Sequence, residues 1–579
     1  MRKPGFVGLS LLLALASHSS QAAPQPPVRQ INAPYFSDGL HFDETAVFWL
    51  GQVGPHENYA DVRVGYIDRA LWVHVNIMDQ HLWYDTSPTA ATLTDWDAVT
   101  IYLDKRGNAG STPTSDSFRF DGQLNWYEPR ANWQAAYQGN GTSWVSATIP
   151  ITTYNNWRGD VPPNQSGAQQ GWFIAFSIPF NSLGLSGPPP QGTVWGFGIK
   201  LHDRDAATGP MQPEESWPEP MSAEQPASWG RLRFGLPGYT SPTPIVRQGT
   251  TVVRQGLNGS VVPDAVVGGN TLCGGTLSDY FVQWGNLNYA HVPVFNVQNV
   301  EQISEWPCFS KAFVTFPLTS LPAGKEIISA TLTLHHSGNP GPAPESAYIQ
   351  VLTVDQDWNE NTITWNNAPL AQENLGGVWI APLQQAAPYP GIPYHWDVSR
   401  VVAEAYAAGE PLRLAVYSAS SPFHNGRYFF SADVEDFNAL GRPALTVAWG
   451  ASVASVNASV RPASASTGQI ATFTISWLGS GNAMTLTNDL PAALSAPVLA
   501  PSSSSGTISY NAVSRRIAWH GTPSAGAPVS LTYPVTLATS SRQAIRNTVI
   551  LTDAVSGPVS STALLIANGS QMYLPLTRK

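Results

Sequence analysis

Short runs in which apolar and polar residues alternate recur along the whole chain, a pattern typical of half-buried β-strands. In the run 71–78, Leu71, Val73, Val75 and Ile77 fall on one face of the expected strand. Similar runs lie at 97–104, 172–179, 194–201, 229–234, 313–318, 329–335, 348–354, 412–418, 427–432, 444–449, 471–477, 531–537 and 547–553. The pattern predicts an all-β protein built from antiparallel sheets.

One helix interrupts the strand pattern. Asp397 can cap its first turn, the run 398–408 continues it, and Gly409 can end it. A polar turn with two large rings lies at 355–369, where Trp358 and Trp365 are seven positions apart. Rings of this size are costly to expose, so we expect at least one of them to fill the end of a sandwich core.

Turn-rich and proline-rich stretches divide the strands into three groups. The expected domains are residues 31–236, 243–449 and 451–568, each an antiparallel β-sandwich, followed by a tail at 569–579. A chain of 579 residues is too long for one hydrophobic core, which agrees with this division. The fold class is therefore all-β, with three consecutive sandwiches.

The N-terminus predicts export. Arg2 and Lys3 precede an apolar run at 6–16, and small residues follow up to Ala22, which together are typical of a cleaved signal peptide over residues 1–22. No later segment has the ~20 apolar residues of a transmembrane helix. We expect a secreted, extracellular protein, free or attached to the cell surface.

Composition narrows the range of partners. Charged residues make up 12% of the chain and aromatic residues 11%, with 21 Trp, and the formal net charge is −10. A negative chain without a basic face is poorly suited to nucleic acid. The two cysteines, Cys273 and Cys308, are expected to form a disulfide in an exported protein, closing a loop of roughly 35 residues worth ~3–4 kcal/mol; the alternative is two buried thiols.

The first group of strands resembles the family 9 carbohydrate-binding modules. The resemblance rests on four pieces: 70–75 with Asp79, 97–104, 171–180, and 195–199 with Asp203 and Asp205. It implies a β-sandwich that binds a polysaccharide or a cell-wall glycan, although the same sandwich occurs in haem-binding relatives and as an accessory domain of enzymes.

The second and third groups resemble other secreted modules. The turn 358–365 and the run 313–318 are similar to the DNRLRE domains of secreted bacterial proteins. The motifs at 487–491 and 547–549 resemble the immunoglobulin-like conserved-repeat domains of bacterial surface proteins. The end of the chain, 571–579, resembles a recurring C-terminal sorting motif, and a plain final strand is the alternative.

Sugar binding needs flat aromatic faces beside planar polar groups. Predicted loops of the first sandwich carry such rings, and we select Trp83, Trp126, Trp133 and Trp217 as the candidate carbohydrate-binding residues. Any one of them can instead be a plug that closes the end of the sandwich.

Paired acidic residues suggest a cation site. Asp95 with Asp97, and Asp203 with Asp205, are spaced as oxygen ligands of calcium can be, and turn formation is the alternative reading. No cofactor is required by any motif. The chain also lacks the nucleophile, metalloprotease and phosphate-loop motifs of common enzymes.

The sequence therefore favours an exported, non-catalytic carbohydrate-binding or surface-adhesion protein. The first alternative is a polysaccharide-degrading enzyme, a lyase or glycosidase, with its site in the central sandwich, because two distant carboxyl groups can meet in space. The second is a structural cell-envelope protein that binds nothing small.

Overall fold

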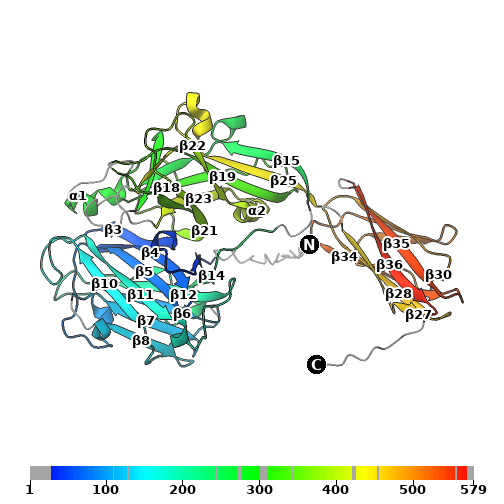
Figure 1. Cartoon of the computed structure of the whole chain (residues 1–579), viewed down its shortest axis with the longest axis horizontal. Helices are drawn as coiled ribbons and strands as arrows, with labels where there is room; N and C mark the ends of the chain where they lie inside the picture. The colour runs from blue at the N-terminus through cyan, green and yellow to red at the C-terminus, as the bar shows by residue number, and fades with distance from the viewer. Residues whose placement is uncertain are drawn as a thin grey trace, which may run out of the picture.

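The computed structural model is dominated by β-strands gathered into three bodies (Figure 1). It describes residues 28–107, 110–126, 130–240, 245–269, 277–299, 309–341, 343–419, 425–452, 455–554 and 557–569. The predicted all-β class, with consecutive antiparallel β-sandwiches, is confirmed. The predicted signal peptide, Cys273, Cys308 and nearly all of the C-terminal tail lie outside the described residues.

The first body, in blue and cyan in Figure 1, packs two sheets face to face. One sheet contains β2 (Tyr35–Phe36), β3 (Ala46–Gly54), β4 (Glu57–Ile67), β5 (Ala70–Met78), β10 (Thr152–Arg158) and β11 (Gly171–Pro179). The other contains β1 (Gln30–Ala33), β6 (Ala98–Asp104), β7 (Ser117–Gln123), β8 (Gln134–Gly139), β9 (Trp144–Ser146), β12 (Val194–His202), β13 (Glu215–Trp217) and β14 (Gly230–Phe234).

The alternation read from the sequence explains which face is buried. Leu71, Val73, Val75 and Ile77 of β5 are all buried in the core between the two sheets. Residues of β5 at the intervening positions, including Trp72, lie on the outer face. This outer face carries the groove described below.

The central body, in green and yellow, is a second sandwich (Figure 1). One sheet has the order β16 (Asp264–Val267), β18 (Phe309–Phe316), β23 (Leu412–Ser418), β20 (Ala347–Val354) and β21 (Ala371–Ile380). The other contains β15 (Ile245–Arg254), β17 (Val294–Asn299), β19 (Glu326–Gly338), β22 (Ile392–Asp397), β24 (Arg427–Phe430) and β25 (Ala444–Ser452).

The two α-helices of the described residues, α1 (Leu277–Val282) and α2 (Ser399–Ala408), belong to this central body. The predicted helix begins one residue later than expected, because Val398 stands at the N-cap and Asp397 accepts a hydrogen bond from the Ser399 N–H at 2.9 Å. Gly409 ends it in the left-handed conformation, as predicted. No described helix is long and apolar enough to cross a membrane.

The core of the first body continues across the junction into the central body, which also has a separate core between its own two sheets. Trp49 and Tyr59 of the first body pack with Phe313, Trp365 and Tyr417 of the central body. Buried polar contacts also cross the junction: Gln350 donates to the Thr45 carbonyl at 2.7 Å, and the side chains of Asn32 and Asn374 each bond to the backbone of the other. The expectation that one of the paired Trp rings fills a core is confirmed by Trp365, which is buried.

The third body, in orange and red, has a core of its own (Figure 1). One sheet contains β26 (Val456–Arg461), β28 (Ile470–Leu478), β30 (Leu494–Pro497), β31 (Ser502–Ser503) and β34 (Pro528–Leu537). The other contains β27 (Ser464–Ala465), β29 (Met484–Asp489), β32 (Thr507–Asn511), β33 (Arg516–Gly521), β35 (Gln543–Asp553) and β36 (Gly557–Ala567). Its apolar residues alternate with exposed ones along β28, β34 and β35, as the sequence pattern requires.

Candidate functional site

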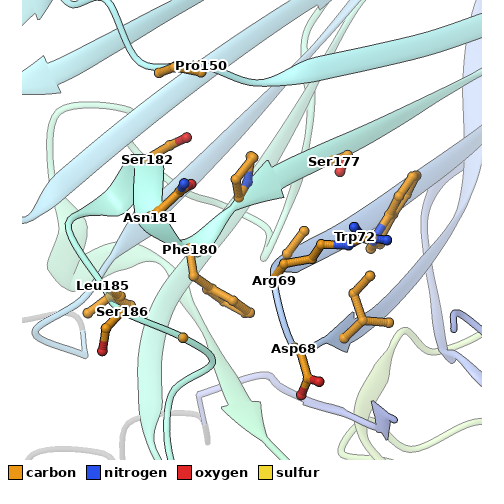
Figure 2. Close-up of a pocket in the computed structure, with 14 residues that line it drawn as sticks. Asp68, Arg69, Trp72, Pro150, Ser177, Phe180, Asn181, Ser182, Leu185 and Ser186 are labelled. Carbon is orange, nitrogen blue, oxygen red and sulfur yellow. The ribbon is translucent and has the colours of Figure 1, made fainter. Parts of the chain in front are cut away.

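A groove of about 840 Å³ opens beside the outer face of the sheet that contains β5 and β11. Trp72 of β5 and Ser177 of β11 lie on its strand side, and the segment after β11, which includes the 3₁₀ turn η4 (Phe180–Leu183), forms the other wall (Figure 2). Trp72 and Ser177 are direct neighbours across the two strands. The groove is therefore built on rigid strands along one wall and on a short turn along the other.

Two stacked aromatic rings mark the strand side. The rings of Trp72 and Tyr154 lie 6.2 Å apart with an interplanar angle of 13°, and Tyr154 of β10 is 48% exposed. Next to them, the rings of His74 and Phe173 stack at 5.1 Å. Alternation along β5, β10 and β11 places these side chains on one face of the sheet. Such a face can pack against the C–H face of a sugar ring.

Polar groups line the groove together with Trp72. Asp68 and Arg69 come from the β4–β5 turn, and Asn181 and Ser182 come from η4, on the opposite wall (Figure 2). Together with Ser177 they offer carboxylate, guanidinium, amide and hydroxyl groups within one groove. An aromatic surface with a few convergent polar groups is typical of small-molecule and sugar sites.

The four Trp residues selected from the sequence fall into two classes. Trp126 is 47% exposed, and its ring lies edge-on to the Trp157 ring with the ring centroids 5.6 Å apart. Trp83 is half-buried. Trp133 is 8% exposed and donates its indole N–H to the Asp85 carbonyl, while Trp217 is 0% exposed and packs on Phe48 and Phe197. Trp133 and Trp217 are thus the sandwich plugs that the sequence analysis weighed as the alternative.

Sequence reasoning did not select Trp72 or Tyr154. The signal was present, because the alternation of β5 turns Trp72 away from the core, and Tyr154 alternates with buried Thr153 and Asn155. What the sequence did not give is the pairing of β10, β11 and β5 in one sheet, which brings the two rings together.

The predicted acidic pairs are divided by the structure. Asp203 and Asp205, directly after β12, come together with Asp79, directly after β5, so that one carboxylate oxygen from each lies within 4.8 Å of the others. Asp97 lies beside them but is occupied: it accepts the Arg204 N–H at 2.9 Å and the Trp83 N–H at 2.6 Å. Asp95 is exposed, and its backbone carbonyl accepts from the Arg204 side chain.

Burial and mutual repulsion raise the pKa values of this acidic group. Burial raises the pKa of Asp79 well above its usual range, and Asp203 adds to the effect. Burial raises the pKa of Asp203 to about 7, with Asp205 as the second cause. The pKa of Asp97 is raised mainly by burial and then by Asp79 and Asp203. Oxygen ligands so close together suit a hard cation such as Ca²⁺, which neutralises their charge.

Among the described residues, the central sandwich brings together one mixed cluster. His291, Glu360 and Asp433 offer ligand or proton-transfer atoms within 4.8 Å of one another, and His291 Nδ1 lies 3.6 Å from Asp433. Burial raises the pKa of Glu360, and the Asp433 charge adds to it. Two carboxyl groups at close range are the arrangement on which the glycosidase alternative depends.

Several solved structures are similar to this chain, with TM-scores below 0.3. A family 9 carbohydrate-binding module from Caldicellulosiruptor kristjanssonii in complex with cellotriose is 17% identical, with a TM-score of 0.27, and covers 38% of this chain and 100% of its own. A putative carbohydrate-binding protein from Bacteroides uniformis is 13% identical, with a TM-score of 0.28, over 36% of this chain and 100% of its own.

The N-terminal domain of the Streptococcus gordonii adhesin Sgo0707 is 8% identical, with a TM-score of 0.18, over 92% of this chain and 100% of its own. Among curated proteins, no sequence matches this chain. Residues 277–439, within the central sandwich, match the family model of carbohydrate-binding module family 96.

Proposed function

We propose that this protein is an exported, non-catalytic carbohydrate-binding protein that attaches to a polysaccharide or cell-wall glycan. The observation that carries the proposal is the stacked pair Trp72 and Tyr154 on the open face beside the groove. The match of residues 277–439 to a carbohydrate-binding family supports the same function for the neighbouring sandwich.

The groove favours a neutral or mildly acidic glycan. Among the described residues that line it, the only charged side chains are Asp68 and Arg69, one of each sign, so the groove carries no strong charge of its own. The formal charge of the chain is −10, which would repel a highly acidic polymer. Aromatic stacking and hydrogen bonds, rather than ion pairs, then supply the affinity.

The experiment is a glycan array on the mature protein, followed by titration of the best ligand. Trp72→Ala and Tyr154→Ala each remove one ring of the pair, and we expect roughly tenfold or larger losses of affinity, as for central binding residues. Trp126→Ala is the matched control, because it removes an exposed ring after β7 that lies against Trp157 and does not line the groove.

The control also decides between two locations. Unchanged affinity in Trp72→Ala and Tyr154→Ala, with loss in Trp126→Ala, would move the site to the loop region around Trp83 and Trp126. Circular dichroism of each variant checks that the sandwich is intact.

The alternative function is a polysaccharide lyase or glycosidase acting at His291, Glu360 and Asp433. In our proposal these residues do not cleave the bound glycan. Incubating the protein with its ligand and measuring new reducing ends and unsaturated products should give none. A product that forms with the intact protein and is lost in Glu360→Gln would replace the binding function by catalysis.

A calcium ion at Asp79, Asp203 and Asp205 is the cation site that we propose for the first sandwich. Three oxygen ligands from two strand ends fit this ion, and backbone carbonyls and water commonly complete its shell. The ion would join the segments that follow β5 and β12. Calcium should raise the Tm of the chelator-treated protein, and Asp203→Asn should abolish that rise.

A further inference from the structure

Two imidazole rings lie next to the acidic group described above and have no part in the glycan groove. His56 sits in the turn between β3 and β4, and His81 follows β5 by three residues. Their rings lie 5.9 Å apart with an interplanar angle of 22°. One nitrogen of each ring and one oxygen of Asp205 lie within 4.8 Å of one another.

Asp205 belongs to two groups at once. With His56 and His81 it forms a set of two nitrogens and one oxygen, and with Asp79 and Asp203 it forms a set of three oxygens. His56 Nδ1 lies 2.8 Å from Asp205 Oδ2, to which Gln212 also donates. The Asp205 carboxylate therefore lies between the two imidazole rings and the other two carboxylates.

Buried carboxylate atoms at this centre remain without a hydrogen bond. Asp79 Oδ2 and Asp203 Oδ1 are buried and have no partner among the described residues, and the two side chains are 1% and 4% exposed. The Trp172 indole N–H lies close to Asp79 and the Asn58 side chain lies close to Asp203, but neither donates to these two oxygens within hydrogen-bonding geometry. Buried carboxylate oxygens left without partners are costly unless a proton or a cation meets them.

The surrounding structure holds the ligands in place. The two backbone N–H bonds to Asp97 hold Trp83, two residues after His81, and Arg204, the residue between Asp203 and Asp205. The His81 N–H donates to Asp79 Oδ1 at 2.8 Å, and the Gln212 N–H donates to the Asp203 carbonyl at 3.0 Å. Such second contacts orient ligands in metal sites.

We propose that His56, His81 and Asp205 bind a divalent transition-metal ion of the zinc class, and that Asp205 is shared with the oxygen-only site beside it. Two imidazoles and a carboxylate are a donor set that suits zinc and similar ions better than calcium, because calcium takes oxygen ligands. The ion would tie together the β3–β4 turn and the segments after β5 and β12, at the end of the sandwich that carries Trp83.

The test uses the full-length protein after chelation and dialysis, with ZnCl₂ alone and CaCl₂ alone as probes. Equilibrium dialysis with metal analysis should find about one zinc per chain. His56→Ala and His81→Ala should each weaken zinc binding at least tenfold. They should leave the rise in Tm that calcium causes unchanged. His41→Ala is the matched control, since His41 is a surface histidine of the same sandwich that pairs with Asp38 at 3.1 Å.

Further variants separate the two metal sites. Asp203→Asn should keep zinc binding and lose the calcium response, whereas Asp205→Asn should weaken both. Zinc binding that is equal in wild type, His56→Ala and His81→Ala would overturn the proposal, as would the absence of zinc binding at micromolar concentrations. Glycan affinity is measured separately, with and without zinc. A failure of zinc binding can then be distinguished from a failure of glycan binding.

Discussion

The most unusual single residue is Lys311, which is 0% exposed at the junction of the first two bodies. Its Nζ lies 3.8 Å from the centre of the Trp365 ring and 4.0 Å from that of Trp49, and it donates to the Tyr59 hydroxyl at 2.9 Å. Burial lowers the pKa of Lys311 well below its usual value, and nearby Asp61 offsets part of this effect. The aromatic rings and the hydroxyl together replace the water that a lysine normally keeps.

Lys311→Ala should lower the free energy of unfolding by about 2–5 kcal/mol, because it leaves a cavity among packed rings and removes the bond to Tyr59. Lys311→Met should recover much of that loss, since it restores volume without a group that is costly to bury. Urea denaturation measures both. The control is Lys325→Ala, whose Nζ lies 6.0 Å from a single ring at the surface. Equal effects in Lys311→Ala and Lys325→Ala would contradict this account.

At the scale of elements, the long strand β19 pairs with three strands of the central sandwich, β22, β24 and β25. His336 pairs with β22 on one side of β19 and with β24 on the other, and its side chain is buried. Burial lowers the pKa of His336 to about 4, and Arg427 adds to the shift. The imidazole is therefore neutral in the folded strand at neutral pH.

We expect His336 to make the folded protein less stable at low pH. The pKa of His336 is about 4 in the folded state and about 6.5 in an unfolded chain, so the unfolded state binds more protons between these values. The contribution of neutral His336 to the free energy of unfolding is fully present above about pH 6.5. It falls as the pH drops towards 4, by up to roughly 3 kcal/mol. Unfolding of wild type and His336→Gln across pH 4–7 measures it. His520→Gln, at an exposed position of the third sandwich, is the control; a slope in His336→Gln equal to that of wild type would refute the assignment.

At the scale of the whole molecule, the chain has two kinds of junction. The first and central sandwiches share buried residues across their boundary, whereas the third sandwich has a separate core. The domain limits expected from the sequence concern only how strands are grouped along the chain. They do not say which groups unfold together, because that depends on the surface buried between them.

Calorimetry should therefore resolve two transitions, one for the first and central sandwiches together and one for the third. Trp49→Ala, at the junction, should lower the free energy of unfolding for the first transition by about 3–5 kcal/mol. It should leave the transition of the third sandwich unchanged. Trp519→Ala, buried in the third core, should do the reverse. Three resolved transitions, or a Trp49→Ala effect confined to one of the two joined sandwiches, would show that they unfold independently.

Much of the fold was readable from the sequence because its strands bury one face only. Alternation predicted the inward side of β5, the long alternating strands of the third sandwich, and the helix that ends at Gly409. Local signals suffice there, since a period of two residues and a glycine stop depend on neighbours in the chain. The size of the rings predicted that at least one of Trp358 and Trp365 is buried, and the structure shows that it is Trp365.

Tertiary structure alone decided the candidate sites. Trp72 and Tyr154 are 82 positions apart and meet only through β11, and the imidazole–carboxylate centre joins three separate turns. The same holds for Trp217, whose burial follows from the packing of β13 between Phe48 and Phe197. Sequence periodicity states which face a side chain takes. Which strands become neighbours, and hence which side chains meet, is set by long-range pairing that leaves no local pattern in the chain.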